Sequence, residues 1–377
     1  MSKLRVALIF GGKSGEHEVS IVSAMSIYKA LDKNKYDVTL VAIDKSGRWV
    51  LPDSKALLSQ PANVRDLRIA SKSQAVSLIS YPSEMNLIPI EKNKPHPEGG
   101  LKFDVILPIL HGTHGEDGTV QGLFELADIP YVGSGVLGSA LCMDKDSAKR
   151  VMRDAGIPVV PFMAVRRREF SSNKKKIADE AIGKFGLPFF VKPSNMGSSV
   201  GVHKAKTAAD VIPLLEDAFR YDTKILVERA VSARELEVAV LGNHDPEASV
   251  VGEIIPRHEF YSYEAKYIDE NGADLKIPAE NLPRGTEESA RELAVRAFRE
   301  LDCAGMARAD FFLDKKTGEL FLNELNTIPG FTSISMYPKL WEASGIPYPE
   351  LLDRLIELAL ERHREREGLK TTYEPAT

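Results

Sequence analysis

One stretch of the chain, MARADFFLDKKTGELFLNELN, constrains the fold more than any other because it has the pattern of a β-hairpin. Two strand-like arms flank residues 316–318, where a glycine in last position suits a three-residue loop that ends in a left-handed conformation. If Lys315 pairs with Glu319, counting outward predicts which side chains face each other on one side of the sheet. The predicted opposed pairs are Asp310 with Glu324 and Arg308 with Asn326.

The carboxylates of Asp310 and Glu324 would then lie directly opposite each other, which is unfavourable without compensation. Oxygen ligands from Asp, Glu and Asn side chains suit Mg²⁺, so the trio formed with Asn326 predicts a metal site. The alternatives are a solvated sheet face or a salt bridge from Arg308. A one-residue bulge in either strand would break the count.

A second stretch, FVKPSNMGSSVG at residues 190–201, joins a buried strand to a loop of small residues. The apolar residues 187–191 predict a strand covered on both faces, and Lys192 and Pro193 end it. The loop carries two glycines and three serines, so its backbone amides can approach a ligand closely.

The segment MDKDSAKRVMRDAG predicts a helix with a lysine where a bound anion would be favourable. Asp144 is the expected N-cap and Gly156 the expected stop, and Lys145 follows the cap, where the helix dipole disfavours a cation. For Lys145 alone, a solvated surface position is the simpler interpretation. Together with Lys192, the amide-rich loop and a metal site, it indicates a nucleoside triphosphate.

Composition argues against several other classes of protein. The chain of 377 residues carries 49 basic and 54 acidic residues with a net charge of −5, and no basic block indicates nucleic-acid or membrane binding. Cys142 and Cys303 lie far apart without CxxC spacing, which argues against a disulfide framework or a zinc site. With no signal-like or membrane-spanning stretch, we expect a cytoplasmic protein whose partners are small molecules.

The order of strand-like and helix-like patterns predicts an α/β chain of three segments. Residues 1–130 open with a strand, a glycine-rich turn, a helix and a second strand, and are predicted to form an open parallel-sheet domain. Residues 131–227 form the expected central segment, and residues 228–377 form the third, which holds the hairpin.

Three further motifs offer competing interpretations. GGKS at 11–14 lacks the first glycine of a phosphate-binding P-loop. GSGVLG at 133–138 fits GxGxxG, but no acidic residue closes a strand about twenty positions later, so a nicotinamide-dependent dehydrogenase is a poor second choice. HGTHGED at 111–117 has two histidines three apart, yet no third zinc ligand is evident, and a packing role is favoured.

Three acidic residues and one aromatic loop stand out without a unique explanation. Glu16 and Glu18 lie at a helix start, where either one suits the helix dipole. Glu228 is unusual because it ends an apolar strand. YSYEAKY at 261–267 is either a surface aromatic cluster or a lid that closes over a site.

Taken together, the motifs resemble those of the D-alanine–D-alanine ligases of the ATP-grasp superfamily. The resemblance covers nearly the whole chain and keeps the family's order through FGGKSGEHEVS, HGTHGEDGTVQG, PYVGSGVLGSALCMDKD, VKPSNMGSSVGV, YEAKY, RADFFLD and NELNTIPGFTSISMYP. It implies an ATP-grasp fold in which an N-terminal substrate-binding domain at 1–130 precedes central (131–227) and C-terminal (228–377) domains that sandwich ATP between antiparallel sheets.

The same resemblance assigns the nucleotide and metal sites. It places two Mg²⁺ or Mn²⁺ ions on the trio that the hairpin count predicts independently. Lysines and the small-residue loop would hold the triphosphate, and two glutamates would hold the adenine amino group and the ribose. The residues implied for ATP are Lys145, Lys192 and Ser199 at the phosphates, Glu228 at the adenine and Glu235 at the ribose.

The implied reaction transfers the γ-phosphoryl group of ATP to one D-alanine, whose acyl phosphate is then attacked by the amine of a second. Glu18 would anchor the first ammonium group and bond with Ser198 and Tyr267. The other implied residues are His111 near the first substrate, Lys266 on the phosphate, Arg308 and the Gly330 amide at the tetrahedral oxyanion, and Ser335 on the second carboxylate.

The resemblance further implies a homodimer that supplies the dipeptide for peptidoglycan precursors. Ligases that use D-lactate or D-serine as second substrate are the alternatives, and Tyr267 favours the dipeptide because ester-forming relatives usually lack it. A nucleotide-binding regulatory protein without catalysis is the alternative from another class. The intact set of predicted catalytic residues argues against it.

Overall fold

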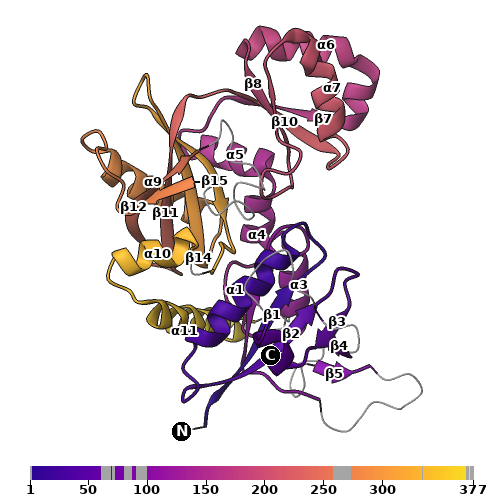
Figure 1. The fold of residues 1–377 in the computed structure, drawn as a ribbon, viewed down its shortest axis with the longest axis vertical. Coiled ribbons are helices and arrows are strands. Elements are labelled where there is room, and N and C mark those ends of the chain that lie inside the picture. The colour runs from indigo at the N-terminus through magenta and orange to yellow at the C-terminus, as the bar shows by residue number, and fades with distance from the viewer. Residues whose placement is uncertain are drawn as a thin grey trace.

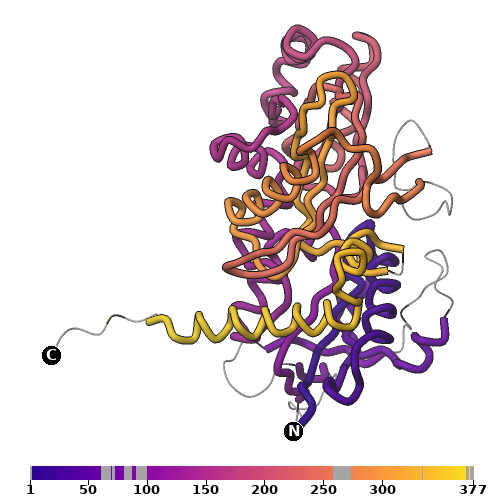
Figure 2. The backbone as a smooth tube through the Cα atoms, turned by 90° about the vertical axis from the view of Figure 1, so that its left-hand side faces the viewer, coloured from indigo at the N-terminus to yellow at the C-terminus, as the bar shows by residue number. Residues whose placement is uncertain are grey.

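The computed structural model of the protein describes residues 2–60, 69, 73–79, 87–90, 100–257, 273–332, 334–370 and 373. Three sheets with their covering helices follow one another along the long axis of the molecule (Figures 1 and 2). Within these residues, every helix is too short or too polar to span a lipid bilayer.

The N-terminal sheet has the strand order β5-β4-β3-β2-β1-β6. Its strands are β1 (Leu4–Gly11), β2 (Tyr36–Ile43), β3 (Trp49–Leu51), β4 (Gln74–Leu78), β5 (Leu87–Pro89) and β6 (Val105–Ile109). The predicted parallel pairing holds for β1 with β2 and with β6, whereas β3, β4 and β5 extend the sheet in antiparallel fashion. The neighbouring strands β1 and β6 therefore end at the same edge. The helices are α1 (His17–Ala30), α2 (Ser54–Leu58) and α3 (Thr119–Leu126).

The second sheet is antiparallel throughout, with the order β7-β10-β8-β9. Its strands are β7 (Phe162–Arg166), β8 (Phe189–Pro193), β9 (His203–Ala205) and β10 (Lys224–Arg229), and its helices are α6 (Arg167–Phe185) and α7 (Ala208–Ala218). The helices pack on the sheet through their own buried apolar cluster, which includes Phe170, Leu215 and Val227. This unit lies at one end of the molecule in Figure 1.

The third sheet is also antiparallel, with the order β13-β12-β11-β14-β15. Its strands are β11 (Ala233–Gly242), β12 (Glu247–Pro256), β13 (Ala273–Lys276), β14 (Gly305–Asp314) and β15 (Leu320–Asn326). The other helices in the described part of the chain are α4 (Val136–Met143), α5 (Lys145–Asp154), α9 (Thr286–Glu300), α10 (Met336–Ala343) and α11 (Tyr348–Glu367).

Two of these helices, α4 and α5, lie early in the predicted central segment but pack against the third sheet. Cys142 on α4 and Met152 on α5 share a buried cluster with Leu236 of β11 and Phe298 of α9. The predicted cap of α5 is confirmed, because the Asp144 side chain accepts a hydrogen bond from the Ser147 amide. This packing places Lys145, the first residue of α5, next to the sheet that carries the hairpin.

The C-terminal helices α10 and α11 join the third sheet to the first. Their residues Tyr337, Trp341 and Leu355 lie in one buried cluster with Phe10 of β1 and Met306 of β14. Figure 2 shows α11 lying across the molecule beside the N-terminal sheet. This continuous core fixes the N-terminal sheet edge relative to the hairpin.

The two strands of the hairpin pair as predicted at the candidate site residues, with Asp310 opposite Glu324 and Arg308 opposite Asn326. Nearer the turn the pairing is one residue away from the predicted count, since Leu313 faces Leu320. A bulge at Asn323 restores the count before the acidic residues are reached. The bulge also brings the Asn323 side chain into the same pocket as its neighbours.

Candidate active site

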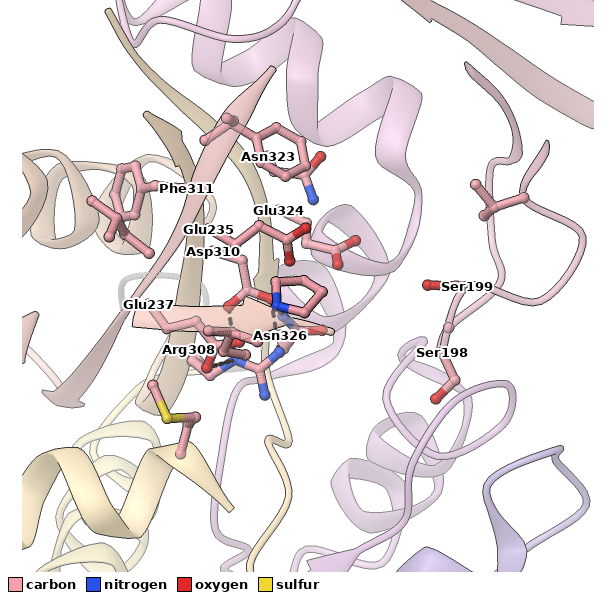
Figure 3. Close-up of a pocket in the computed structure, with 18 of the residues that line it drawn as sticks. Ser198, Ser199, Glu235, Glu237, Arg308, Asp310, Phe311, Asn323, Glu324 and Asn326 are labelled. Carbon is pink, nitrogen blue, oxygen red and sulfur yellow. Dashed lines mark hydrogen bonds and ion pairs between the residues drawn. The ribbon is translucent and has the colours of Figure 1, made fainter. Parts of the chain in front are cut away.

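A cavity of about 1460 Å³ lies where the three sheets approach one another, and most of the predicted site residues line it. Figure 3 shows the hairpin side chains on one wall and the small-residue loop on the opposite wall. The predicted residues that line the cavity are His111, Lys145, Lys192, Ser198, Ser199, Glu228, Glu235, Arg308, Asp310, Glu324, Asn326, Gly330 and Ser335.

Strands β11, β14 and β15 build the acidic wall. Arg308 donates two hydrogen bonds to Asp310, from Nε to Oδ1 at 2.7 Å and from an Nη atom to Oδ2 at 2.7 Å. Asn326 Nδ2 donates to the same Oδ2 atom at 2.9 Å. Arg308 Nε also lies 3.0 Å from Glu237 Oε2, so Glu237 belongs to the arginine's surroundings.

The predicted metal ligands therefore gather as the hairpin count required (Figure 3). Asp310, Glu324 and Asn326 present carboxylate and amide oxygens to one side of the sheet, a donor set that suits a hard divalent cation. Among the described residues, His, Cys, Asp and Glu side chains alone form no group of three that could hold a metal.

The opposite wall is the loop that follows β8, and its backbone is strained at two consecutive serines. Ser198 and Ser199 have φ values of 50° and 60°, a left-handed conformation that is uncommon for residues with a side chain. Strain of this kind is maintained where the surrounding structure holds it, often at binding sites. A Cβ added at Gly197 would lie 2.8 Å from Glu16 Oε2, so the Glu16 carboxylate that accepts from Ser198 would have to shift.

The structure corrects the prediction that Ser198 bonds with Glu18. Ser198 Oγ donates a hydrogen bond to Glu16 Oε1 instead, and Glu16 lines the cavity. Glu18 lies on α1 with Oε1 2.6 Å from Lys45 Nζ, and it is absent from the residues found to line the cavity. Two positions along a helix correspond to a rotation of about 200°, so only one of the two glutamates can face the cavity.

Glu116 is a second cavity carboxyl that sequence reasoning missed. Its Oε1 atom accepts a hydrogen bond from the Gly112 amide at 2.9 Å, and its Oε2 atom accepts one from the Ile328 amide at 3.3 Å. Burial, together with the neighbouring Glu16 carboxylate, raises the pKa of Glu116 to about 8. The signal available in the sequence was position, since both glutamates follow strands that end at one edge of a parallel pair.

His111 serves as a link between the N-terminal sheet and the third sheet. Its Nδ1 atom lies 3.0 Å from the Ile328 carbonyl oxygen, and its Nε2 atom lies 3.4 Å from Ser23 Oγ. Burial lowers the pKa of His111, so its imidazole is neutral near pH 7. These contacts confirm the packing role favoured from the sequence and place the ring at the cavity.

The two predicted phosphate-binding lysines approach the cavity from different elements. Lys145 Nζ donates to the Met196 carbonyl oxygen at 2.9 Å and lies 3.2 Å from Glu324 Oε2. Burial opposes the charge of Lys145, but Glu324 outweighs it and raises the lysine's pKa. Lys192 Nζ lies 2.5 Å from Glu228 Oε2 and 3.3 Å from Asn323 Oδ1.

Two further predicted site residues, Gly330 and Ser335, lie at or just before the start of α10. Ser335 is the N-cap residue of α10, and its Oγ atom accepts a hydrogen bond from the Thr332 amide at 3.0 Å. A Cβ on Gly330 would lie 2.8 Å from that Oγ atom, so glycine keeps the two segments close. The positive end of a helix dipole next to these residues favours an anionic group. Lys266 and Tyr267 lie outside the described residues.

The two antiparallel sheets that line one cavity with lysines, carboxylates and a strained small-residue loop define an ATP-grasp protein. Comparison with known proteins identifies the family. Residues 5–134 match the family described as "D-ala D-ala ligase N-terminus", and residues 151–357 match "D-ala D-ala ligase C-terminus". The chain belongs to the D-alanine–D-alanine ligase family.

Individual relatives are similar to this chain over nearly its full length. A D-alanine–D-alanine ligase A of Bradyrhizobium diazoefficiens is 50% identical over 374 residues, covering 98% of this chain and 99% of its own. The D-alanine–D-alanine ligase structure from Coxiella burnetii has a TM-score of 0.81 at 36% identity, covering 97% of each chain. The D-Ala:D-Ser ligase VanG of Enterococcus faecalis has a TM-score of 0.81 at 34% identity, covering 95% of this chain and 100% of its own.

Proposed function

We propose that this chain joins two D-alanine molecules into D-alanyl-D-alanine for peptidoglycan precursor synthesis, with conversion of ATP to ADP and phosphate. The observation that carries the proposal is the cavity between two antiparallel sheets, in a chain 50% identical over its length to a D-alanine–D-alanine ligase. The D-serine alternative is less favoured, because relatives that are 48% to 50% identical over nearly the whole chain are named D-alanine–D-alanine ligases.

ATP would bind between the second and third sheets. The triphosphate would contact Lys145, Lys192 and the amides of the loop that carries Ser199. Glu228 would accept a hydrogen bond from the adenine amino group, and Glu235 would contact the ribose. Support comes from the position of both lysines at the cavity, where Lys192 is buried and the Lys145 side chain is 14% exposed, and from the small residues of the loop.

Divalent ions, Mg²⁺ or Mn²⁺ and two in number, would be held by Asp310, Glu324 and Asn326. The donor chemistry fits, because oxygen atoms from adjacent strands converge there. When bound, such ions would neutralise charge on the transferred phosphoryl group.

The chain's own residues would mainly position the reactants, as phosphoryl transfer requires. In the first step the γ-phosphoryl group moves to a carboxylate oxygen of one D-alanine, giving an acyl phosphate and ADP. In the second step the amine nitrogen of the other D-alanine, having lost a proton, attacks the carbonyl carbon, and the carbon–oxygen bond to phosphate breaks.

The positions of the residues in the cavity suggest their roles in substrate binding and catalysis. Glu16, in place of Glu18, would hold the first ammonium group together with Ser198. Arg308 and the Gly330 amide would stabilise the oxyanion, and Ser335 at the start of α10 would hold the second carboxylate. Lys266 on the phosphate and Tyr267 beside Ser198 stay predictions from the resemblance, as does a homodimer, which light scattering would check.

Phosphate release tests the proposed function. Purified protein with ATP and Mg²⁺ is given D-alanine, D-alanine with D-serine, D-alanine with D-lactate, or L-alanine, and products are identified by mass. We expect the dipeptide from D-alanine and none from L-alanine. Preferential formation of a mixed product would overturn the second-substrate assignment, and no phosphate release under any condition would overturn the activity.

A further inference from the structure

A buried lysine that plays no part in the proposed chemistry lies next to the adenine end of the cavity. Lys149 on α5 is 1% exposed, and its Nζ atom lies 3.2 Å from Glu228 Oε1. The other oxygen of Glu228, Oε2, lies 2.5 Å from Lys192 Nζ. Glu228 and Lys192 line the cavity, whereas Lys149 is not among the described residues that line it.

The three residues form a buried charge cluster in which the Glu228 carboxylate lies between the ammonium groups of Lys149 and Lys192. Burial opposes ionisation of Glu228, but Lys149 and Lys192 outweigh it and lower the pKa of the carboxyl. Burial lowers the pKa of Lys149, and the Glu228 carboxylate opposes that change. A cation is stable at so buried a position only beside a partner of opposite charge.

The contact between Lys149 and Glu228 is an ion pair without hydrogen-bond geometry. Within the described part of the chain, neither Lys149 Nζ nor Glu228 Oε1 makes a hydrogen bond. In contrast, Lys192 Nζ is close to both Glu228 and Asn323. Lys192 therefore has more polar partners than Lys149.

Nucleotide binding would change this balance, because a triphosphate in the cavity attracts Lys192 away from Glu228. Without Lys149, Glu228 would then be a buried carboxylate that has lost both of its ion-pair partners among the described residues, and it would take up a proton or move. A protonated carboxyl is a poorer acceptor for the amino group of adenine.

We propose that Lys149 is a positioning residue for the nucleotide base, which keeps Glu228 ionised and in place once Lys192 engages the triphosphate. This inference rests on the proposed ATP site. It also assigns Lys149 a part in base selection. Adenine offers an amino group to an ionised Glu228, whereas guanine offers a carbonyl oxygen at the same position, which the carboxylate repels.

The test measures binding of ATP and GTP by calorimetry to wild-type protein and to Lys149→Met, Lys149→Arg, Glu228→Gln and Lys149→Met/Glu228→Gln. We expect Lys149→Met to weaken ATP binding about tenfold and to narrow the ratio of ATP to GTP affinity, since a desolvated charge contact is lost. We expect Lys149→Arg to restore most of the affinity. The double variant should bind ATP no more weakly than Glu228→Gln, because both changes remove the same ionised acceptor.

Kinetics provide a second readout that a merely structural lysine would not move. Lys149→Met should raise KM for ATP while KM for D-alanine changes less than about twofold. The matched control is Arg150→Met, which removes a cation from the next position of α5, where the side chain is 55% exposed. If Lys149→Met does not fold, Lys149→Gln takes its place in every comparison.

A variant that lowers Tm but keeps wild-type ATP affinity and the wild-type ATP to GTP ratio would overturn the proposal, as would additive losses in the double variant. These outcomes are separable from failure of the proposed function. Wild-type protein that binds ATP but forms no dipeptide would refute ligation while leaving the binding comparison intact.

Discussion

Among the carboxyl groups that line the cavity, two pairs differ in what surrounds them. The hairpin pair, Asp310 and Glu324, lies on adjacent strands beside cations, with Arg308 bonded to the first and Lys145 paired with the second. A cation therefore compensates each member of the hairpin pair. The salt bridge from Arg308, which the sequence left open as an alternative to a metal site, is therefore present, and the metal site stays a proposal.

The loop pair, Glu16 and Glu116, lies on segments that follow β1 and β6. Within the described residues, its hydrogen-bond donors include the Ser198 hydroxyl on Glu16 and two backbone amides on Glu116. The pKa of Glu116 is raised to about 8 by burial and by Glu16. The comparison teaches that residue type does not set the charge state of a cavity carboxyl, because the nearest partners decide it.

Removing one charge from the hairpin pair should have the largest effect on activity. Asp310→Asn keeps the side-chain shape but removes the proposed metal ligand, so we expect phosphate release to fall by roughly 10³-fold, since bound metal supplies several kcal/mol. Glu319→Gln, an exposed change on the same hairpin, is the control. Wild-type rates for Asp310→Asn at saturating Mg²⁺ would exclude Asp310 as a ligand.

The corrected assignment of the loop pair gives a direct contrast between neighbouring glutamates. Glu16→Gln should lower kcat/KM for D-alanine by roughly 10 to 10²-fold, the size of a lost hydrogen bond to a charged group. Glu18→Gln removes only the contact with Lys45 and should change kcat/KM less than about threefold. The reverse order of effects, measured by the same phosphate assay, would restore the original prediction.

The close contact between the loop and Glu16 can be tested without changing any charge. Gly197→Ala places a methyl group 2.8 Å from Glu16 Oε2, and we expect roughly tenfold lower kcat/KM as the Glu16 carboxylate or the loop shifts. Gly183→Ala on α6 is the control, because no atom lies within 4 Å of its added Cβ. Equal activity for both variants would show that the loop does not need its present distance from Glu16.

The raised pKa of Glu116 predicts a pH dependence of stability rather than of rate. Because the folded pKa lies above the unfolded value of about 4.3, the protonated carboxyl stabilises the fold fully at low pH, and this contribution is lost as pH rises to about 8. Urea unfolding should show wild type losing stability relative to Glu116→Gln between about pH 5 and 8, by a few kcal/mol.

If the free energies of unfolding of wild type and Glu116→Gln differ by the same amount across that pH range, the raised pKa of Glu116 is contradicted. The comparison uses the change of the difference with pH, because Glu116→Gln also disturbs the amide hydrogen bonds by a fixed amount. Glu292→Gln, at an exposed position of α9, serves as the control for a surface glutamate.

Much of the fold was predictable because its signals are local. The strand β1, the helix α5 with its Asp144 cap and the hairpin all follow from periodicity, capping and turn residues within a few positions. The antiparallel extension by β3, β4 and β5 was not predicted, since short strands in an irregular segment carry little pattern.

The predicted pairing of Asp310 with Glu324 is correct, but it depends on a bulge that the residue count did not include. The turn closes one residue away from the predicted register, and the bulge at Asn323 offsets that difference. Lys192 contacts Asn323 from another sheet, so the bulge is part of the tertiary arrangement. Alternation along the strands placed Arg308 and Asp310 on one face in either register.

The sequence by itself determined the family, the order of the motifs and the kinds of side chain that meet at the cavity, because these depend on residue identity and short-range spacing. Only the tertiary structure decided that Glu16 and not Glu18 contacts Ser198, that Glu116 lies near Glu16, and that Lys149 lies beside Glu228. These contacts join segments roughly 80 to 180 positions apart, with separations such as 182 for Glu16 and Ser198, and a charge's surroundings exist only once the chain has folded.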